Sequence, residues 1–222
     1  MPTPKAEETG RRILEAALAL FRVQGFDATT MREIARESHV ATGAAYYYYP
    51  SKEAIVLDFY QHSCAEMQPK IEAALDGVRG LEDRLRALIS VKLAHFEPNR
   101  GVLRSLLRNG ADPRHPLSPF STETAAIRNL DVDGFRRILV DCGLRIPRDL
   151  APYLPGVLWF LQMGVIFFWV IDESPRQART ARLLDLAVKS AAFLIRAASL
   201  PLMRPLRKTA VELIRTVQGE AV

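Results

Sequence analysis

Residues 26–53 read FDATTMREIARESHVATGAAYYYYPSKE, and this stretch carries most of the information about the fold. Thr30 and Glu33 have the spacing of a capping box, in which a Thr hydroxyl and a Glu side chain bind free backbone amides at a helix start. A short helix is therefore expected here, with a turn at Ser38. A second short helix is expected at about residues 41–48. Two short helices joined by such a turn are typical of a helix-turn-helix.

The second short helix has a surface that suits DNA. Thr42, Gly43 and Ala44 are small, so the backbone at the helix start can approach a groove closely. Hydroxyl groups and helix-start amides are donors suited to phosphate oxygens. Between residues 38 and 51 the sequence has no acidic residue, and Lys52 adds a positive charge at the start of the next helix.

Four consecutive tyrosines, Tyr46 to Tyr49, end this helix. Neighbouring side chains on a helix point about 100° apart, so a run of four cannot be buried completely. We expect Tyr46 and Tyr47 to be exposed, and Tyr48 or Tyr49 to lie in the core. The alternative to a DNA-binding surface is an aromatic core cluster.

The strings TTMREIA at residues 29–35 and VATGAAYYYYPSKE at 40–53 resemble the DNA-binding domain of TetR/AcrR-type (tetracycline-repressor-like) transcriptional regulators. The resemblance covers about residues 9–56. It implies an all-α, homodimeric fold with an N-terminal three-helix helix-turn-helix domain and a C-terminal helical ligand-binding and dimerisation domain. We place these domains at 1–52 and 53–222.

By position, the resemblance also implies a set of DNA contacts. The residues that it places in the major groove or on phosphates are Thr30, Arg32, Thr42, Gly43, Tyr46, Tyr47 and Lys52. Arg32 can reach a base edge or a phosphate, and its alternative is a solvated arginine. Ala45 and Tyr49 stand where a larger aliphatic residue and a Phe are frequent in the family. Residues 1–52 hold seven basic and six acidic side chains, so we expect only a moderate dependence of DNA affinity on salt.

The rest of the chain has the periodicity of further helices, with prolines between them. An amphipathic first helix ends near Gly25, and a long helix runs from Ser51 towards Leu75. Further helices are expected at about 81–96, 100–109, 121–142, 149–172, 176–199 and 203–218. Together with the two short helices, the chain is expected to form about nine or ten helices.

Two groups of apolar residues in this body are candidates for binding. The first is a stripe that favours a dimer interface, with intrachain core as the alternative: Leu183, Leu184, Ala187, Ala191 and Leu194. The second comes from several helices and could line a cavity for an apolar or amphipathic ligand, with plain core as the alternative. Its members are Phe96, Leu103, Leu107, His115, Phe120, Phe135, Trp159, Gln162, Met163 and Phe167. Gln162 and His115 are its polar anchors.

Composition excludes several other classes. The 222 residues are 49% hydrophobic and 25% charged, which is ordinary globular composition, and the net charge of +5 permits an anionic partner. The four histidines have no metal-ligand spacing, and the sequence has no GxSxG or P-loop motif, so we expect no enzyme, metal or cofactor. Two cysteines suit a reducing compartment, the cytoplasm. A thiol-based redox sensor using Cys64 or Cys142 remains an alternative.

Two segments require a membrane test. Residues 154–171 are long and apolar enough to span a bilayer, but a helix that is apolar all round also suits a buried position. Residues 201–217 are basic and amphipathic, and we expect them to pack as a final helix. The N-terminus has no apolar run, so a secretory signal is not expected. We expect no membrane partner, because both segments suit packing within the protein.

Together these features favour a regulator that binds a palindromic operator as a homodimer. Its partners are double-stranded DNA and a small-molecule effector. Repression is the expected mode, with ligand binding shifting the population to a form that leaves the operator. An activator of the same fold is the alternative.

Overall fold

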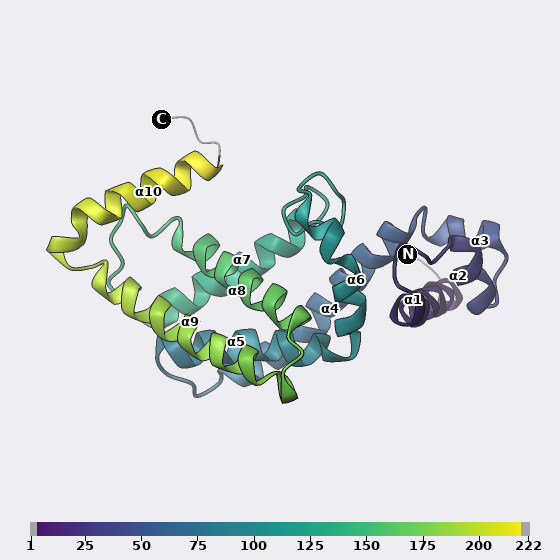
Figure 1. The fold of residues 1–222 in the computed structure, drawn as a ribbon, viewed down its shortest axis with the longest axis horizontal. Coiled ribbons are helices and arrows are strands. Elements are labelled where there is room, and N and C mark those ends of the chain that lie inside the picture. Colours follow the sequence, from purple (N-terminus) through teal and green to yellow (C-terminus); the bar gives the residue numbers. More distant parts are fainter. Residues whose placement is uncertain (1–3, 219–222) are drawn as a thin grey trace. The chain divides into compact units, whose positions relative to one another are not determined.

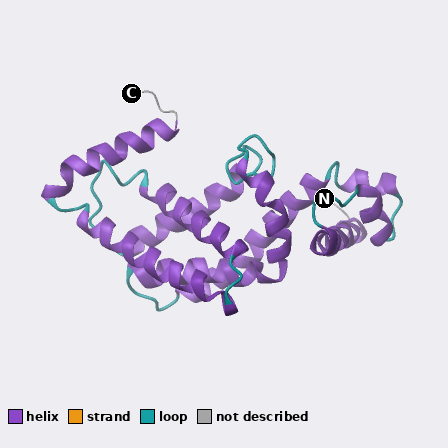
Figure 2. Cartoon of the chain, viewed as in Figure 1, coloured by secondary structure: helices purple, strands orange, loops and turns teal. Residues whose placement is uncertain are grey.

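A computed structural model describes residues 4–218, except for the side chains at 107–109, 111, 217 and 218. Over this range the chain forms ten α-helices and three short 3-10 helices, and Figure 2 shows loops but no strand between them. The predicted all-α class is confirmed.

The chain divides into two compact units that do not follow the order of the sequence. The first contains the described residues up to 69 together with 94–128, and the second contains 70–93 together with the described residues from 129 onward. Each unit is built from two separate stretches of the chain. The predicted domain boundary between residues 52 and 53 stays a prediction.

The first unit contains the helix-turn-helix and the helices that support it (Figure 1). Its complete helices are α1 (Pro4–Gln24), α2 (Met31–Glu37), α3 (Thr42–Tyr48) and α6 (Arg100–Ala111). It also holds α4 (Lys52–Leu75) as far as residue 69.

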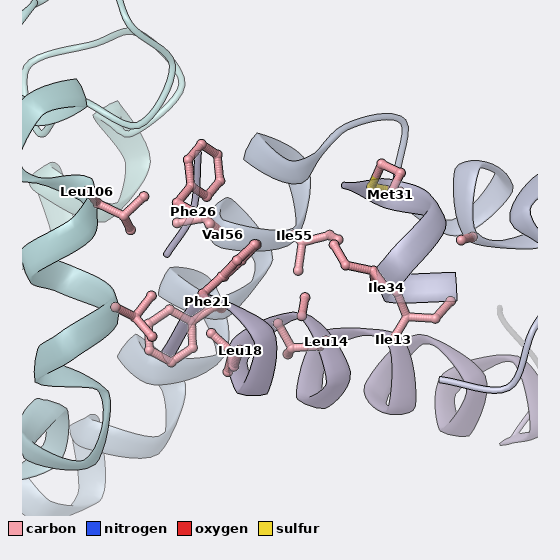
Figure 3. Close-up of a cluster of buried hydrophobic side chains, with 14 of the residues drawn as sticks. Ile13, Leu14, Leu18, Phe21, Phe26, Met31, Ile34, Ile55, Val56 and Leu106 are labelled. Carbon is pink, nitrogen blue, oxygen red and sulfur yellow. The ribbon is translucent and has the colours of Figure 1, made fainter. Parts of the chain in front are cut away.

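One hydrophobic core runs through this unit. Apolar residues of α1 recur every three or four positions, which gives the helix one buried face ending at Phe21. In Figure 3, side chains from α1, Ile34 of α2 and Ile55 of α4 gather with Leu106 of α6. The helix-turn-helix therefore shares its core with α4 and α6.

The second unit contains the remaining helices. They are α5 (Leu81–Phe96) up to residue 93, α7 (Ala125–Asp141) from residue 129, α8 (Leu154–Ile171), α9 (Ala178–Ala197) and α10 (Arg204–Gln218). Helix α8 packs on α9. Helix α7 starts later than the predicted residue 121, because residues 121–124 form turns. The Ser121 hydroxyl donates to the Pro116 carbonyl and accepts from the Thr124 N–H, and the Thr124 hydroxyl donates to the Ser118 carbonyl.

Helix α8 is the one helix in the described part of the chain that is long and apolar enough to cross a membrane. Its mean hydropathy is 2.0, and 44% of the segment is buried inside the single chain. Trp169 and Gln162 are among its fully buried side chains. This burial is typical of a core helix.

A buried carboxylate connects α8 to α9. Asp172 accepts hydrogen bonds from the backbone N–H of Ser174 (3.0 Å) and from the N–H and hydroxyl of Thr180 (2.9 and 2.7 Å). Burial by itself raises the pKa of Asp172, but the hydrogen bonds from Thr180 and Ser174 outweigh it and hold the pKa well below its ordinary value. The folded state therefore favours the ionised carboxylate of Asp172.

We expect Asp172→Asn to lower the melting temperature at pH 7. Because the folded pKa lies below the ordinary value of 3.8, the carboxylate stabilises the wild type above that value and less as pH falls below it. The difference between wild type and variant should therefore shrink in acid. Thermal melts between pH 7 and 2, with the exposed Asp76→Asn as control, measure this. A difference that is constant with pH would contradict it.

Candidate nucleic-acid interface

The helix-turn-helix begins with the predicted capping box. Thr30 precedes α2, and its hydroxyl accepts a hydrogen bond from the Glu33 N–H at 3.2 Å. The Glu33 carboxylate accepts from the Thr30 N–H and from the Thr30 hydroxyl, both at 2.8 Å. These hydrogen bonds lower the pKa of Glu33. The hydroxyl proton of Thr30 is thus used inside the cap, so a phosphate has to compete with Glu33 for it.

The turn between α2 and α3 depends on one left-handed residue. His39 has a φ of 55°, and the next residue, Val40, donates its N–H to the Ala35 carbonyl at 2.9 Å. Such a hydrogen bond ends a helix sharply and satisfies a terminal carbonyl. The chain therefore reverses within four residues and starts α3 at Thr42.

Helix α3 presents an exposed face with no charge. Tyr47 is 86% exposed and Tyr46 is 51% exposed, and Thr42 and Gly43 are also exposed. A Cβ on Gly43 would meet nothing within 4 Å, so the surroundings leave the helix start accessible. Arg32 on α2 is exposed too. Hydroxyls, amides and one guanidinium are thus available to an anionic surface.

The sequence predicts that Tyr48 or Tyr49 lies in the core, and the structure places both against it. Tyr48 and Tyr49 are half-buried, and both pack against the shared core. The Tyr49 hydroxyl donates to Asp58 of α4 at 2.6 Å. Burial, followed by the hydrogen bond to Asp58, raises the pKa of Tyr49 well above its ordinary value, so the phenol stays protonated. Tyr49 fixes the end of α3 to α4.

Lys52 has an intramolecular role that the sequence did not reveal. Its ammonium donates to the Phe26 carbonyl at 2.6 Å and lies 4.5 Å from the centre of the Phe26 ring. The lysine thereby holds the segment between α1 and α2 against the start of α4. Its predicted phosphate contact stays a prediction, and a phosphate has to share the ammonium with this carbonyl.

The predicted ligand-binding residues fall in both units. In the first unit, Phe96 packs against Phe59 with 5.9 Å between ring centres, and His115 Nδ1 accepts from the Leu117 N–H at 3.1 Å. The side chain of Leu107 lies outside those described. The remaining members are half-buried or buried side chains: Leu103 and Phe120 in the first unit, and Phe135, Trp159, Gln162, Met163 and Phe167 in the second. A shared cavity stays a prediction.

The predicted dimer residues divide between two faces of α9. Leu184 and Ala191 are buried in the chain's own core, whereas Leu183 and Ala187 are half-buried and Leu194 is exposed. Further apolar side chains of α9 and of α8 are exposed. They are Leu186 and Phe193 of α9 and Val157, Phe160 and Ile171 of α8.

The fold and this interface define a helix-turn-helix DNA-binding protein, and the comparison with known families agrees. Residues 13–59 match the family "Bacterial regulatory proteins, tetR family", and residues 84–212 match "Tetracyclin repressor-like, C-terminal domain". The chain belongs to the TetR family of transcriptional regulators. It is a regulator and not an enzyme.

Curated relatives are regulators of the same kind. The chain is 31% identical to the HTH-type transcriptional regulator SrpR of Pseudomonas putida over 110 residues, which are 49% of this chain and 50% of that protein. It is 32% identical to HbdR of Aromatoleum sp. (strain CIB) over 143 residues, 59% of this chain and 61% of that one. The matched part is thus less than two thirds of either relative.

Solved structures share the fold across nearly their whole length. The fatty acid degradation regulator FadR from Bacillus halodurans superposes with a TM-score of 0.64 and 15% identity, over 85% of this chain and 96% of that one. FadR from Bacillus subtilis, in complex with stearoyl-CoA, gives 0.62 and 16%, over 80% and 97%. At these identities the likeness shows the fold alone.

We expect Lys52→Met to destabilise the protein by about 1–3 kcal/mol, because it keeps the aliphatic stem on Phe26 but removes a charge-assisted hydrogen bond. Urea unfolding followed by circular dichroism measures this, with the exposed Lys5→Met as the matched control. Unchanged unfolding combined with weaker operator binding would instead place Lys52 on DNA phosphates.

Proposed function

We propose that this regulator represses transcription by binding a palindromic operator as a homodimer, and that an apolar or amphipathic small molecule releases it. The observation that carries the DNA-binding part is the exposed, uncharged face of α3 at the end of a well-formed helix-turn-helix. The family supports regulation by DNA binding. The mode of control and the ligand are our proposals, and so is a cytoplasmic location.

The proposed DNA contacts combine direct and backbone recognition. Thr42, Gly43 and Tyr46 enter the major groove, where the absence of bulk at the helix start lets the backbone approach base edges. The exposed hydroxyl of Tyr47 and the guanidinium of Arg32 reach phosphates or a base. Thr30 and Lys52 contribute to phosphate binding while they maintain their internal hydrogen bonds.

The exposed apolar side chains of α8 and α9 support the proposed homodimer. Each of these two helices exposes apolar side chains on the face opposite its buried residues, and exposed apolar groups of this kind mark a surface for a partner. A second copy covering both helices gives a four-helix interface. The dimer then carries two helix-turn-helix units, each of which we call a reader. The two readers match two half-sites about one DNA turn apart, roughly 34–36 Å.

The shared core of the first unit gives a route from ligand to DNA. Val102 and Leu106 of α6 are buried in the same core as α1. Outside the core, Arg22 of α1 donates two hydrogen bonds to the Asn99 side chain at 2.7 and 3.2 Å, immediately before α6. A ligand that favours another position of α6 therefore moves α1 and, with it, the reader.

The thiol-sensor alternative has less support. Cys64 and Cys142 are both half-buried. Burial raises the pKa of Cys142, and the nearby Arg84 only partly offsets this, so the reactive thiolate is disfavoured.

A reporter gene driven by the operator distinguishes an activator from a repressor. Removal of the protein lowers expression of the reporter if the protein is an activator.

The proposal predicts that selection from randomised duplexes at about 0.15 M salt enriches a palindrome. On that palindrome, Tyr46→Ala should weaken binding at least roughly tenfold, because it removes a contact to the groove. The exposed Val23→Ala on α1 is the control and should bind as wild type does. Normal binding by Tyr46→Ala would show that α3 is placed wrongly on the DNA.

A second prediction concerns the dimer. Leu194→Arg puts a charge in the proposed interface and should raise the dimer dissociation constant by about 100-fold or more. Light scattering over a concentration series measures the mass, with Leu202→Arg, at an exposed leucine on neither helix, as the control. A variant that stays dimeric would remove α9 from the interface.

A further inference from the structure

Three polar side chains from three helices meet inside the second unit. Lys92 of α5 lies with its ammonium 2.5 Å from Oδ1 of Asp131 on α7. The side-chain amide of Gln162 on α8 donates to the other oxygen of the same carboxylate at 2.9 Å. We call these residues the polar triad.

The polar triad is buried and electrically balanced. The side chain of Lys92 is 4% exposed, that of Asp131 is 20% exposed, and Gln162 is fully buried. A single charge at this depth is strongly disfavoured, but the ammonium and the carboxylate neutralise each other. The triad therefore offers hydrogen bonds without a net charge.

One atom of the triad has no partner. An ionised carboxylate only accepts hydrogen bonds, so Gln162 has to direct its NH₂ group to Asp131, and its carbonyl oxygen faces elsewhere. That oxygen, Oε1, is buried and has no hydrogen-bond partner among the described residues. Buried polar atoms are nearly always paired in folded proteins. Oε1 therefore has an unused capacity to accept a hydrogen bond, which a donor from another molecule can satisfy.

Each member of the polar triad has a buried apolar residue close to it on its own helix. One helical turn from each of its members lies a buried side chain on the same face: Leu88 of α5, Phe135 of α7 and Trp159 of α8. These large side chains suit the apolar part of a molecule whose polar group meets the triad.

We propose that the polar triad binds the hydroxyl group of an otherwise apolar ligand. The hydroxyl donates to Oε1 of Gln162 and accepts from Lys92, whose ammonium has three N–H groups and uses one on Asp131. The balanced charge selects against a carboxylate or an amine at this position. This inference rests on the proposed function, that the body binds an apolar or amphipathic effector, and it names the effector's polar group.

Three probes of similar shape test this on the full-length protein. 4-Hexylphenol donates and accepts hydrogen bonds, 4-hexylanisole only accepts, and 4-hexylbenzoate is an anion. Calorimetric titration should show the phenol binding about tenfold or more tightly than each of the others, because only the phenol satisfies Oε1. Equal affinities, or no binding by the phenol, would overturn the inference. A water molecule alone beside Oε1 gives equal affinities.

Gln162→Met gives the complementary test, because it keeps the length of the side chain and removes the amide. The ratio of phenol to anisole affinity should fall to about one in this variant and stay at the wild-type value in the exposed Gln61→Met control. A ratio unchanged by Gln162→Met would overturn the inference. The comparison of probes in the wild type keeps the test decisive if the variant fails to fold.

Operator binding, measured on the same preparation, separates the two proposals. A protein that binds its operator but does not distinguish the phenol from the anisole contradicts the polar triad as a hydroxyl site and leaves the regulator intact. A protein that distinguishes the probes but binds no operator contradicts the proposed function and supports the site.

Discussion

Burial of the apolar face of α1 is the constraint on which the DNA-binding part depends. A unit of about 50 residues buries little apolar surface and is only marginally stable by itself. Here Ile55 and Val56 of α4 and Val102 and Leu106 of α6 complete the core that α1, α2 and α3 begin. The reader is therefore not an independent module. The helices that stabilise the reader also determine its position, so a shift of α4 or α6 also shifts the reader.

Helix α3 can face outward because its position is fixed from both ends. It has only seven residues, no side-chain cap and one buried residue, Ala45. At its start, the left-handed His39 and the hydrogen bond from Val40 set the direction of the chain. At its end, Tyr49 is bound to Asp58. Little of the surface of α3 is needed for folding, and the free part includes the residues proposed to read DNA.

Local patterns predicted the fold well because they depend on neighbours in the chain. The capping box and the exposure of part of the tyrosine run follow from helix geometry alone. The hydrogen-bond partner of Lys52 could not be predicted in this way, because the Phe26 carbonyl lies 26 residues away in the chain. A lysine at a helix start equally suits a phosphate. The burial of Lys92 was also missed, since a charged residue on an amphipathic helix is normally expected in solvent. Gln162 was singled out in the sequence because it is the one strongly polar residue of an apolar helix, and its role as a ligand anchor stays a prediction.

The second unit reverses the usual pattern of polar outside and apolar inside at two places. The polar triad lies in the interior, and apolar side chains of α8 and α9 lie outside. Both exceptions involve α8, whose composition alone resembles a membrane span. One face of α8 packs in the core, and Val157, Phe160 and Ile171 lie at helical spacing on another. In the homodimer that we propose, α8 contacts its own chain on one side and a second copy on the other, and this accounts for a helix that is apolar nearly all round. Only a residue with a polar partner, such as Gln162, can then interrupt it.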